Sequence, residues 1–310
     1  MPKSIEWLEV ATLSSGMPLR LPVHKIVGEG KGPVLGLTAT IHGDEILPIE
    51  IIRQVFKRVD EKALKGTVLA MPVCNPLAVQ NLMRPNPGDK LNLNRVFPGD
   101  PNGYLSERIA YTITEKFLKR VNYLVDFHSG ASRSIADYMF VFKDRDFGLA
   151  FGLENNYAGS PPDGSSLKAA EALGVTATTV ELGGMDIACT SYVEKGVKGV
   201  LNVMKHTGML QGSTSLPKEQ RIFSRKTTLR PGVGGLLYSR VFAEDIGRTY
   251  PKGEVMGEVI SPYTFETVEE LKAPYGKNLL IHVPAFTTMF EAGEYAYQLA
   301  DMDGAEIIRR

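Results

Sequence analysis

The sequence is poor in cysteine and has no excess of charge of either sign. Cys74 and Cys189 are the only cysteines among 310 residues, too few for a disulfide framework, so we expect two reduced, buried thiols. Lys plus Arg and Asp plus Glu each number 35, so the overall basic charge expected of a nucleic-acid binder is absent. With a hydrophobic content of 43%, this composition is typical of an ordinary globular protein.

Long apolar runs are missing as well. No segment approaches the roughly 18 apolar residues of a membrane span, and the N-terminal MPKSIEWLEV lacks the apolar region of a signal peptide. We therefore expect a cytoplasmic protein without a membrane partner. A chain of 310 residues is long enough to bury the core of an enzyme, and a homo-oligomer remains open.

Short apolar segments alternate with helical patterns over the first two thirds of the chain. Segments rich in Val, Ile and Leu predict buried strands at 34–41, 67–73, 122–127, 137–142 and 176–182. Apolar residues at helical spacing predict helices from Ile46 to Val59 and from Leu105 to Phe117. This alternation indicates an α/β fold with a mostly parallel or mixed sheet flanked by helices.

A third helix and a smaller β domain follow. Ser191 and Glu194 fit a capping box, which predicts a helix that ends near Gly208. Beyond it, short β-prone segments alternate with Gly and Pro. We therefore divide the chain into a catalytic domain, 1–215, and an all-β domain, 216–310, and expect the boundary in a polar stretch between them.

Two histidines stand directly after or at the end of predicted strands. His42 follows the first strand, Glu45 stands three residues later where a helix should begin, and His128 closes the third strand. Ligands bind at the carboxyl edge of open α/β sheets, and two imidazoles with one carboxylate are a known catalytic zinc set. Taken alone, His-x-x-Glu is more often a surface pair, and Glu45 could simply favour a helix N-terminus.

The surroundings of these candidates add one supporting residue. Asp126 shares a strand face with His128 and could orient its imidazole, although a purely structural Asp is nearly as common. The remaining histidines stand in no comparable setting, and we expect structural roles for them: His24, His206 and His282.

A long loop and a further strand end supply candidate catalytic groups. The loop 75–100 contains Arg84 and the adjacent Asn94 and Arg95, suited to a carboxylate or an oxyanion unless they are solvated surface residues. Glu181 ends the last predicted strand before two glycines. It could take a proton from a water molecule at the metal, or form a buried ion pair instead.

Four segments occur in the order found in a known family. They are His42-Gly43-Asp44-Glu45, Asn94-Arg95-Val96-Phe97-Pro98-Gly99, Asp126-Phe127-His128-Ser129-Gly130 and Glu181-Leu182-Gly183-Gly184. With them, the sequence resembles the succinylglutamate desuccinylase and aspartoacylase family, relatives of the zinc carboxypeptidases. The C-terminal segment resembles the family's β domain, a biotinyl- or lipoyl-like barrel, and lacks the lysine motif that would carry a prosthetic group.

The resemblance implies a zinc-dependent hydrolase of a linear amide bond. The implied zinc ligands, for one ion per chain, are His42, Glu45 and His128. Glu181 would be the general base, Arg84 would polarise the scissile carbonyl, and Asn94 and Arg95 would bind a substrate carboxylate. The implied substrate is a small N-acyl amino acid, cleaved to a carboxylate and an amino acid. A zinc carboxypeptidase acting on peptides and a non-catalytic metal-binding module are the alternatives.

Two positions concern substrate specificity. Family members commonly have Asp directly before the Leu-Asn-Arg sequence, whereas this chain has Asn92. Arg133, shortly after the second histidine segment, is a candidate for recognising the substrate side chain.

Overall fold

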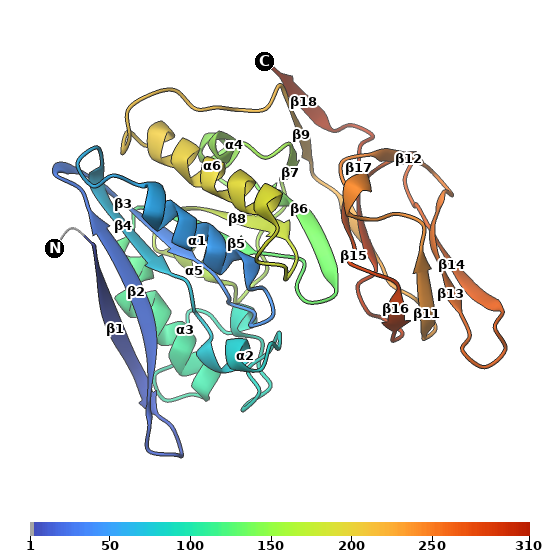
Figure 1. Ribbon diagram of the computed structural model, residues 1–310, viewed down its shortest axis with the longest axis horizontal. Helices are drawn as coiled ribbons and strands as arrows, with labels where there is room; N and C mark the ends of the chain where they lie inside the picture. Colours follow the sequence, from blue (N-terminus) through green and yellow to red (C-terminus); the bar gives the residue numbers. More distant parts are fainter. Residues whose placement is uncertain (1–2) are drawn as a thin grey trace.

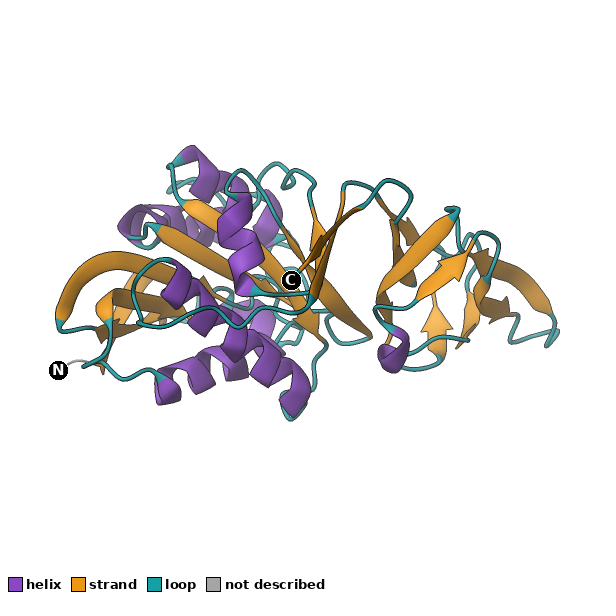
Figure 2. Ribbon diagram, turned by 90° about the horizontal axis from the view of Figure 1, so that it is seen from above, coloured by secondary structure: helices purple, strands orange, loops and turns teal. Residues whose placement is uncertain are grey.

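The computed structural model describes residues 3–310 and contains a large sheet with helices on both faces and a smaller sheet beside it (Figure 1, Figure 2). The helices are α1 (Leu47–Arg58), α2 (Pro76–Gln80), α3 (Leu105–Lys116), α4 (Arg145–Phe151), α5 (Ser166–Ala172) and α6 (Thr190–His206), with short 3-10 helices η1 (Leu93–Arg95), η2 (Leu118–Arg120) and η3 (Ala243–Asp245). The strands of the first two thirds are β1 (Lys3–Thr12), β2 (Pro18–Val27), β3 (Gly30–Thr38), β4 (Lys65–Met71), β5 (Tyr123–His128), β6 (Ser134–Phe140), β7 (Asn155–Tyr157) and β8 (Thr176–Gly183). The later strands are β9 (Glu219–Phe223), β10 (Lys226–Leu229), β11 (Gly235–Ser239), β12 (Thr249–Pro251), β13 (Val255–Ile260), β14 (Thr267–Lys272), β15 (Lys277–Pro284), β16 (Thr288–Phe290), β17 (Tyr297–Asp301) and β18 (Glu306–Arg309).

The large sheet has 14 strands within the described residues and is mixed. Its centre, β4-β3-β5-β8, is parallel, and β2 and β6 join the two sides of this centre in the antiparallel sense. The strands β14-β13-β11-β16 form the separate, antiparallel small sheet near the C-terminus. The predicted α/β fold with a mixed sheet and a smaller C-terminal β part is therefore confirmed.

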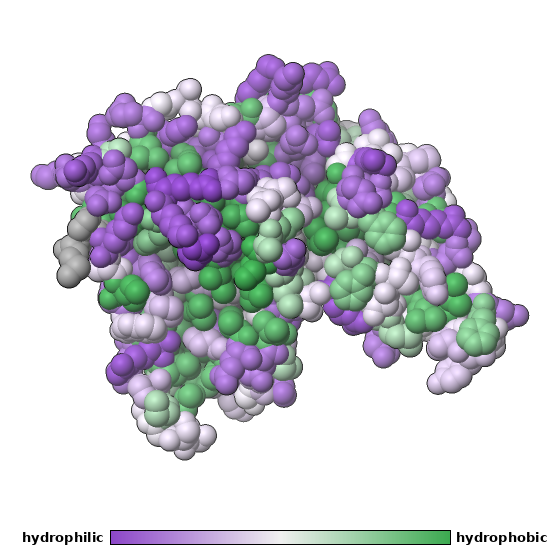
Figure 3. Space-filling view, in the orientation of Figure 1, coloured by the Kyte–Doolittle hydropathy of each residue, from purple (hydrophilic) through white to green (hydrophobic). Residues whose placement is uncertain are grey.

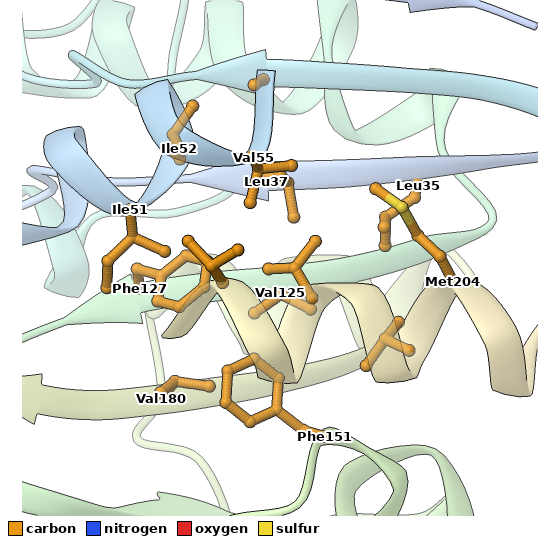
Figure 4. Packing of buried hydrophobic residues seen from close by; sticks show 14 of the residues in the cluster. Leu35, Leu37, Ile51, Ile52, Val55, Val125, Phe127, Phe151, Val180 and Met204 are labelled. Carbon is orange, nitrogen blue, oxygen red and sulfur yellow. The ribbon is translucent and has the colours of Figure 1, made fainter. Parts of the chain in front are cut away.

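Helices cover both faces of the parallel centre, which is why its strands are apolar on both sides. On one face, side chains of α1 and α6 pack on those of β3, β5 and β8; Ile51, Leu37, Val125 and Val180 lie in this cluster (Figure 4). On the other face, α3 and α5 cover a second cluster. The outer side of α6 is charged, and hydrophilic residues accordingly dominate the upper left of Figure 3. No helix within residues 3–310 is both long enough and apolar enough to cross a membrane.

The segment His42–Glu45, which carries two of the candidate ligands, lies in a loop rather than at a strand end. The predicted strand 34–41 ends early, at Thr38, because Thr40 takes a left-handed φ of 54° that turns the chain away from the sheet. The helix that follows begins only at Leu47, so the prediction that Glu45 lies in its first turn is wrong. Pro48 explains this start, since proline is suited to the first turn of a helix.

The start of α6 also differs from the prediction. Cys189 is its N-cap residue, no side chain caps the helix, and Ser191 already lies inside it, so the predicted capping box is wrong. Glu194 instead accepts hydrogen bonds from Arg58 of α1 across the pair of packed helices. Both cysteines are free as expected, but Cys189 is partly exposed and only Cys74 is buried.

Segment 216–310 is attached to the first two thirds of the chain by strand pairing. The polar stretch 212–232, in which we expect the domain boundary, contains β9 and β10, and β15 pairs with β6 of the first two thirds. β17 and β10 then continue the large sheet beyond β15. The strands β11, β13, β15 and β17 are among the short β-prone segments expected in this part of the chain. The domain division after residue 215 stays a prediction.

Candidate active site

One row of paired residues runs across the large sheet and brings the candidate residues together. His128 of β5 pairs with Glu181 of β8, and Glu181 pairs with Tyr138 of β6. Residues paired in register project from the same face of a sheet, so these three side chains lie side by side. Two residues earlier, Asp126 of β5 pairs with Thr38 of β3 and shares the face of His128.

His42, Glu45 and His128 form a buried cluster. Each offers a nitrogen or oxygen atom within 4.8 Å of the atoms of the other two. The Nδ1 atoms of both histidines face the Glu45 carboxylate, at 2.8 Å for His42 and 2.7 Å for His128, and lie 3.2 Å from each other. All three residues are 2% exposed. The structure thus brings the three predicted ligands together, with both imidazoles turned the same way.

The outer nitrogen of each imidazole meets a fixed polar partner. Asn92 Oδ1 lies 3.1 Å from His42 Nε2, and Asp126 Oδ2 lies 3.3 Å from His128 Nε2. Asp126 is itself held by hydrogen bonds from the hydroxyls of Thr38 and Ser166, at 2.6 and 2.5 Å. Partners of this kind set the ring orientation and leave Nδ1 free for a ligand. Asn92 was noted in the sequence only as a departure from the family, and the structure places it in this role.

The electrostatics of the cluster favour a charged carboxylate. Burial opposes the ionisation of Glu45, but attraction to His42 and His128 outweighs it and holds the pKa of Glu45 well below its ordinary value. Burial lowers the pKa of His42 to about 4. Burial also acts to lower the pKa of His128, but the carboxylates of Glu45 and Asp126 outweigh it and raise that pKa well above its ordinary value. Two close carboxylates therefore attract a positive charge to this point.

Glu181 has the properties of a general base. Burial raises its pKa to about 7, with the Glu45 carboxylate acting in the same direction and His128 against it. A base works best when its pKa is near the working pH. The alternative of a buried ion pair finds little support, because no salt bridge to Glu181 occurs within residues 3–310.

The long loop delivers its basic residues to the same place. Arg84 donates a hydrogen bond to Glu45 at 3.0 Å and lines the space in front of the cluster. Asn94 and Arg95 line it as well, but both are partly engaged. The Asn94 amide oxygen accepts from the Ser166 backbone at 2.9 Å, and Arg95 donates to the Asn94 carbonyl at 2.6 Å.

Two adjoining cavities open beside the cluster, and Glu181, Arg84 and Tyr138 line both. The first, about 300 Å³, is lined by His42, His128 and Lys226 and is called here the Lys226 cavity. The second, about 560 Å³, is called the His282 cavity. The residues that line it are Asp44, Glu45, Arg84, Ser129, Gly130, Ala131, Ser132, Arg133, Ser134, Tyr138, Glu181, Arg230, His282, Phe290, Ala292, Gly293, Glu294, Tyr295 and Gln298.

Lys226 lines the first of these cavities and is not among the residues predicted from the sequence. Its ammonium group lies over the ring of Tyr138, 4.7 Å from the centroid, and donates to the Tyr138 hydroxyl at 3.0 Å and to Gln298 at 2.8 Å. Burial lowers its pKa to about 8, while attraction to Glu181 acts the other way. No local motif marks this lysine, because it reaches the cavity only through the pairing of β10 with β17.

His282 is buried and also lines a cavity, and its expected structural role stays a prediction. His282 pairs with Ala136 of β6 and with Gln298 of β17, which places it on the extension of the same sheet surface and in the cavity wall. His24 packs edge-on against Phe56, with ring centroids 5.7 Å apart, and stays outside both cavities.

Arg133, the candidate for recognising the substrate side chain, lines the His282 cavity. It already forms an ion pair with Glu294 at 3.2 Å, however, and its guanidinium lies 5.3 Å from the centroid of the Phe290 ring. Arg133 therefore links the loop after β5 to the C-terminal segment.

Comparisons with known proteins show the family of this chain. The model of the succinylglutamate desuccinylase/aspartoacylase catalytic domain matches residues 31–207, more than half of the chain. The chain belongs to this family. The matched residues include the cluster, the long loop and Glu181, and the family takes its name from hydrolases that cleave the amide bond of N-acyl amino acids.

One curated relative in the family has a defined activity. It is N-alpha-acetyl-L-2,4-diaminobutyric acid deacetylase of Halomonas elongata, 29% identical over 210 residues, which is 64% of this chain and 61% of the relative. The match thus spans about three fifths of that relative's length.

Solved structures of family members share the fold over nearly the whole chain. A succinylglutamate desuccinylase of Silicibacter sp. TM1040 superposes with a TM-score of 0.85 at 24% identity, covering 97% of this chain and 95% of the other. The product-bound ectoine utilization protein EutE (DoeB) of Ruegeria pomeroyi superposes with a TM-score of 0.83 at 23% identity, covering 97% and 99%. At this identity the likeness concerns the fold, including its C-terminal part.

Proposed function

We propose that this protein is a zinc-dependent amidohydrolase that cleaves an N-acyl amino acid to a carboxylate and an amino acid. The observation that carries the proposal is the convergence of His42 and Glu45, from the loop after β3, with His128, whose strand neighbour is Glu181. The activity of the curated relative, removal of an acetyl group from an acylated amino acid, supports the same reaction class.

The chemistry of the donor set fits zinc. Two imidazole nitrogens and a carboxylate oxygen are ligands of catalytic zinc, and bonds of about 2.0–2.1 Å in a tetrahedron place ligand atoms about 3.3 Å apart. The distances of 3.2, 2.8 and 2.7 Å between the facing atoms of His42, His128 and Glu45 are close to this value, so a small expansion suffices. Zinc held there would act as a Lewis acid toward the scissile carbonyl and the attacking water.

The remaining residues then have separate tasks. Glu181 takes a proton from the attacking water and returns it to the leaving amine. Arg84, next to Glu45, stabilises the negative charge that develops on the carbonyl oxygen. Asn94 and Arg95 bind the substrate carboxylate at the rim of the Lys226 cavity.

The C-terminal segment favours small substrates over peptides. Lys226, His282, Tyr295 and Gln298 all come from this segment and line the two cavities. A segment that forms part of the wall of both cavities restricts the room for a peptide on that side of the scissile bond. The carboxypeptidase alternative is therefore less well supported.

A hydrolysis screen tests the proposal. Purified protein loaded with zinc should release amino acids from N-acetyl, N-succinyl or N-aspartyl substrates and should leave C-terminal residues of peptides untouched. Release of amino acids from peptides alone would favour the carboxypeptidase, and no hydrolysis of any amide would favour a binding module.

Arg95→Ala should raise KM for N-acyl amino acids about 10- to 100-fold with a small change in kcat, because a charge-assisted hydrogen bond to the substrate carboxylate is lost. Steady-state kinetics on acid and α-amide forms of one substrate check the assignment. If wild-type protein cleaves the α-amide as fast as the acid, Arg95 does not bind the carboxylate.

Glu181 should also leave a signature in the pH dependence of stability. Because burial raises its pKa from 4.5 to about 7, the folded protein favours the protonated form, and the stability contributed by this side chain falls as the pH rises from 4.5 through 7. Glu181→Gln should therefore raise the unfolding temperature of metal-free protein at pH 8 more than at pH 4. Thermal unfolding followed at both pH values checks this, and an equal shift at both would contradict it.

A further inference from the structure

Tyr138 lies where the two cavities join. Five residues line both cavities: Arg84, Tyr138, Glu181, Tyr295 and Gln298. A substrate with its acyl part in one cavity and its amino acid part in the other has its scissile bond at this junction, where Arg84 and Glu181 have their proposed tasks. Tyr138 projects from the same sheet face as Glu181, with which it is paired in register. Tyr138 is therefore a neighbour of the reacting group.

The Tyr138 hydroxyl accepts a hydrogen bond and keeps its own proton free. Lys226 Nζ lies 3.0 Å from the hydroxyl oxygen, and an ammonium group only donates, so the phenol is the acceptor of this pair. Burial raises the pKa of Tyr138 well above its ordinary value, and the Glu181 carboxylate acts in the same direction, so the proton stays on the oxygen at pH 7. No residue within 3–310 accepts that proton. Since buried Tyr hydroxyls usually have partners, the phenol is a donor available to a substrate.

Lys226 is held in place beside this hydroxyl. Its ammonium group also donates to Gln298 Oε1 at 2.8 Å. It lies over the rings of Tyr138, Phe140 and Tyr157, at 4.7, 5.6 and 5.3 Å from their centroids, and cation–π attraction is strengthened where water is excluded. An ammonium group fixed at one lone pair of the hydroxyl oxygen restricts the directions left to the O–H group.

A donor at the junction can serve only one atom of the scissile amide. The amide nitrogen carries a proton and has no free acceptor site, whereas the carbonyl oxygen accepts and becomes negative as the tetrahedral state forms. Glu181 is the other acceptor at the junction, but no hydrogen bond joins it to the Tyr138 hydroxyl in the described part of the chain. The carbonyl oxygen is therefore the partner that fits.

We propose that Tyr138 is a further catalytic residue, whose hydroxyl donates a hydrogen bond to the scissile carbonyl oxygen, and that Lys226 is the positioning residue that directs this hydroxyl. The proton stays on the phenol throughout. The hydrogen bond adds to the stabilisation that Arg84 provides and leaves the transfer of protons to Glu181. This inference rests on the proposed function, to which it adds two residues.

Removal of the hydroxyl tests the inference. Tyr138→Phe, assayed as zinc-loaded protein on the N-acyl amino acid that the hydrolysis screen identifies, should lower kcat roughly 100-fold, the scale of one lost donor to an oxyanion, and leave KM nearly unchanged. The matched control is Tyr123→Phe, at the start of β5 and outside both cavities, which should keep the wild-type kcat. A wild-type kcat in Tyr138→Phe, or a raised KM alone, would overturn the inference.

Variants of the lysine test its positioning role. Lys226→Met should lower kcat about tenfold or more, because a misdirected donor no longer meets the transition state. Lys226→Arg, which keeps a cationic donor beside the hydroxyl, should restore much of this loss. In Tyr138→Phe, the additional change Lys226→Met should cause no further decrease, since no hydroxyl is left to direct. Losses that simply add would show that Lys226 acts independently of Tyr138 and would overturn its assignment.

A second variant and a binding measurement guard against a folding defect. If Tyr138→Phe does not fold, the double variant, which removes the ammonium group together with its acceptor, should fold and show the same roughly 100-fold decrease in kcat. A methylphosphonamidate, in which tetrahedral phosphorus replaces the acetyl carbonyl carbon, should bind the hydroxyl-free protein less tightly than wild type, and the product amino acid should bind both equally. Equal binding of the phosphonamidate would overturn the inference.

The wild-type protein separates this inference from the proposed function. If it hydrolysed no N-acyl amino acid, the proposed function would fail and the inference with it. If it hydrolysed one and Tyr138→Phe did so at the same rate, only the catalytic assignment of Tyr138 would fail.

Discussion

Glu181→Gln should reduce kcat by about two to four orders of magnitude, which is the usual contribution of a positioned acid or base. The amide has nearly the same shape as the carboxylate but cannot take a proton from water. Because Glu181 is not one of the three clustered ligands, metal content and folding should stay near wild type. The measurement is kcat and zinc content on the same preparation.

The result also separates an enzyme from a binding module. A variant with full metal and unchanged kcat would show that another residue is the base. Loss of metal together with activity would instead place Glu181 in the coordination shell. A protein that only binds a metal has no rate to lose, so the decrease in kcat itself supports the hydrolase.

His128→Ala should lower zinc content from about one ion per chain to a small fraction and abolish activity. The residue supplies one of the three proposed ligand atoms and is 2% exposed, so no neighbouring residue can replace it easily. The loss in metal affinity should exceed the roughly 10- to 100-fold that follows removal of an outer hydrogen-bond partner of a ligand.

Elemental analysis of the purified variant gives the answer, with two matched controls. His206→Ala, at the C-terminal end of α6, should keep the metal. Asp126→Asn, which weakens the partner of His128 Nε2, should fall between the two. Full metal content in His128→Ala, or wild-type activity in the presence of a strong chelator, would contradict the zinc site.

Much of the site could be predicted from local sequence. Runs of Val, Ile and Leu ended by a polar residue and a glycine indicated buried strands with His128 and Glu181 at their ends, and the structure pairs these two residues directly. Parallel neighbouring strands place their carboxyl ends at one edge, so strand prediction was enough to bring these groups together. The same local argument was wrong for Glu45, which precedes its helix although it still reaches the cluster.

Other contacts of the site result from tertiary packing, and no sequence pattern predicted them. Asn92 stands 50 residues from His42 in the chain, and only the folded loop brings its amide to the imidazole. Ser166 reaches Asp126 from α5 in the same way. No periodicity or spacing marks such residues, because their partners are far apart in sequence and any polar side chain of suitable length looks the same locally.

What the sequence by itself determined is the α/β framework, because it depends on hydrophobic periodicity, and the set of candidate ligands and base, His42, Glu45, His128 and Glu181, which it proposed from strand ends and from the family resemblance. Only the tertiary structure decided which residues form the opposite wall of the two cavities. His282 and Lys226 enter the cavities because β15 pairs with β6 and β10 with β17, in one particular register. A shift of one residue would turn either side chain to the opposite face. That register is set by the packing of the whole C-terminal segment and not by the preferences of the residues in each strand.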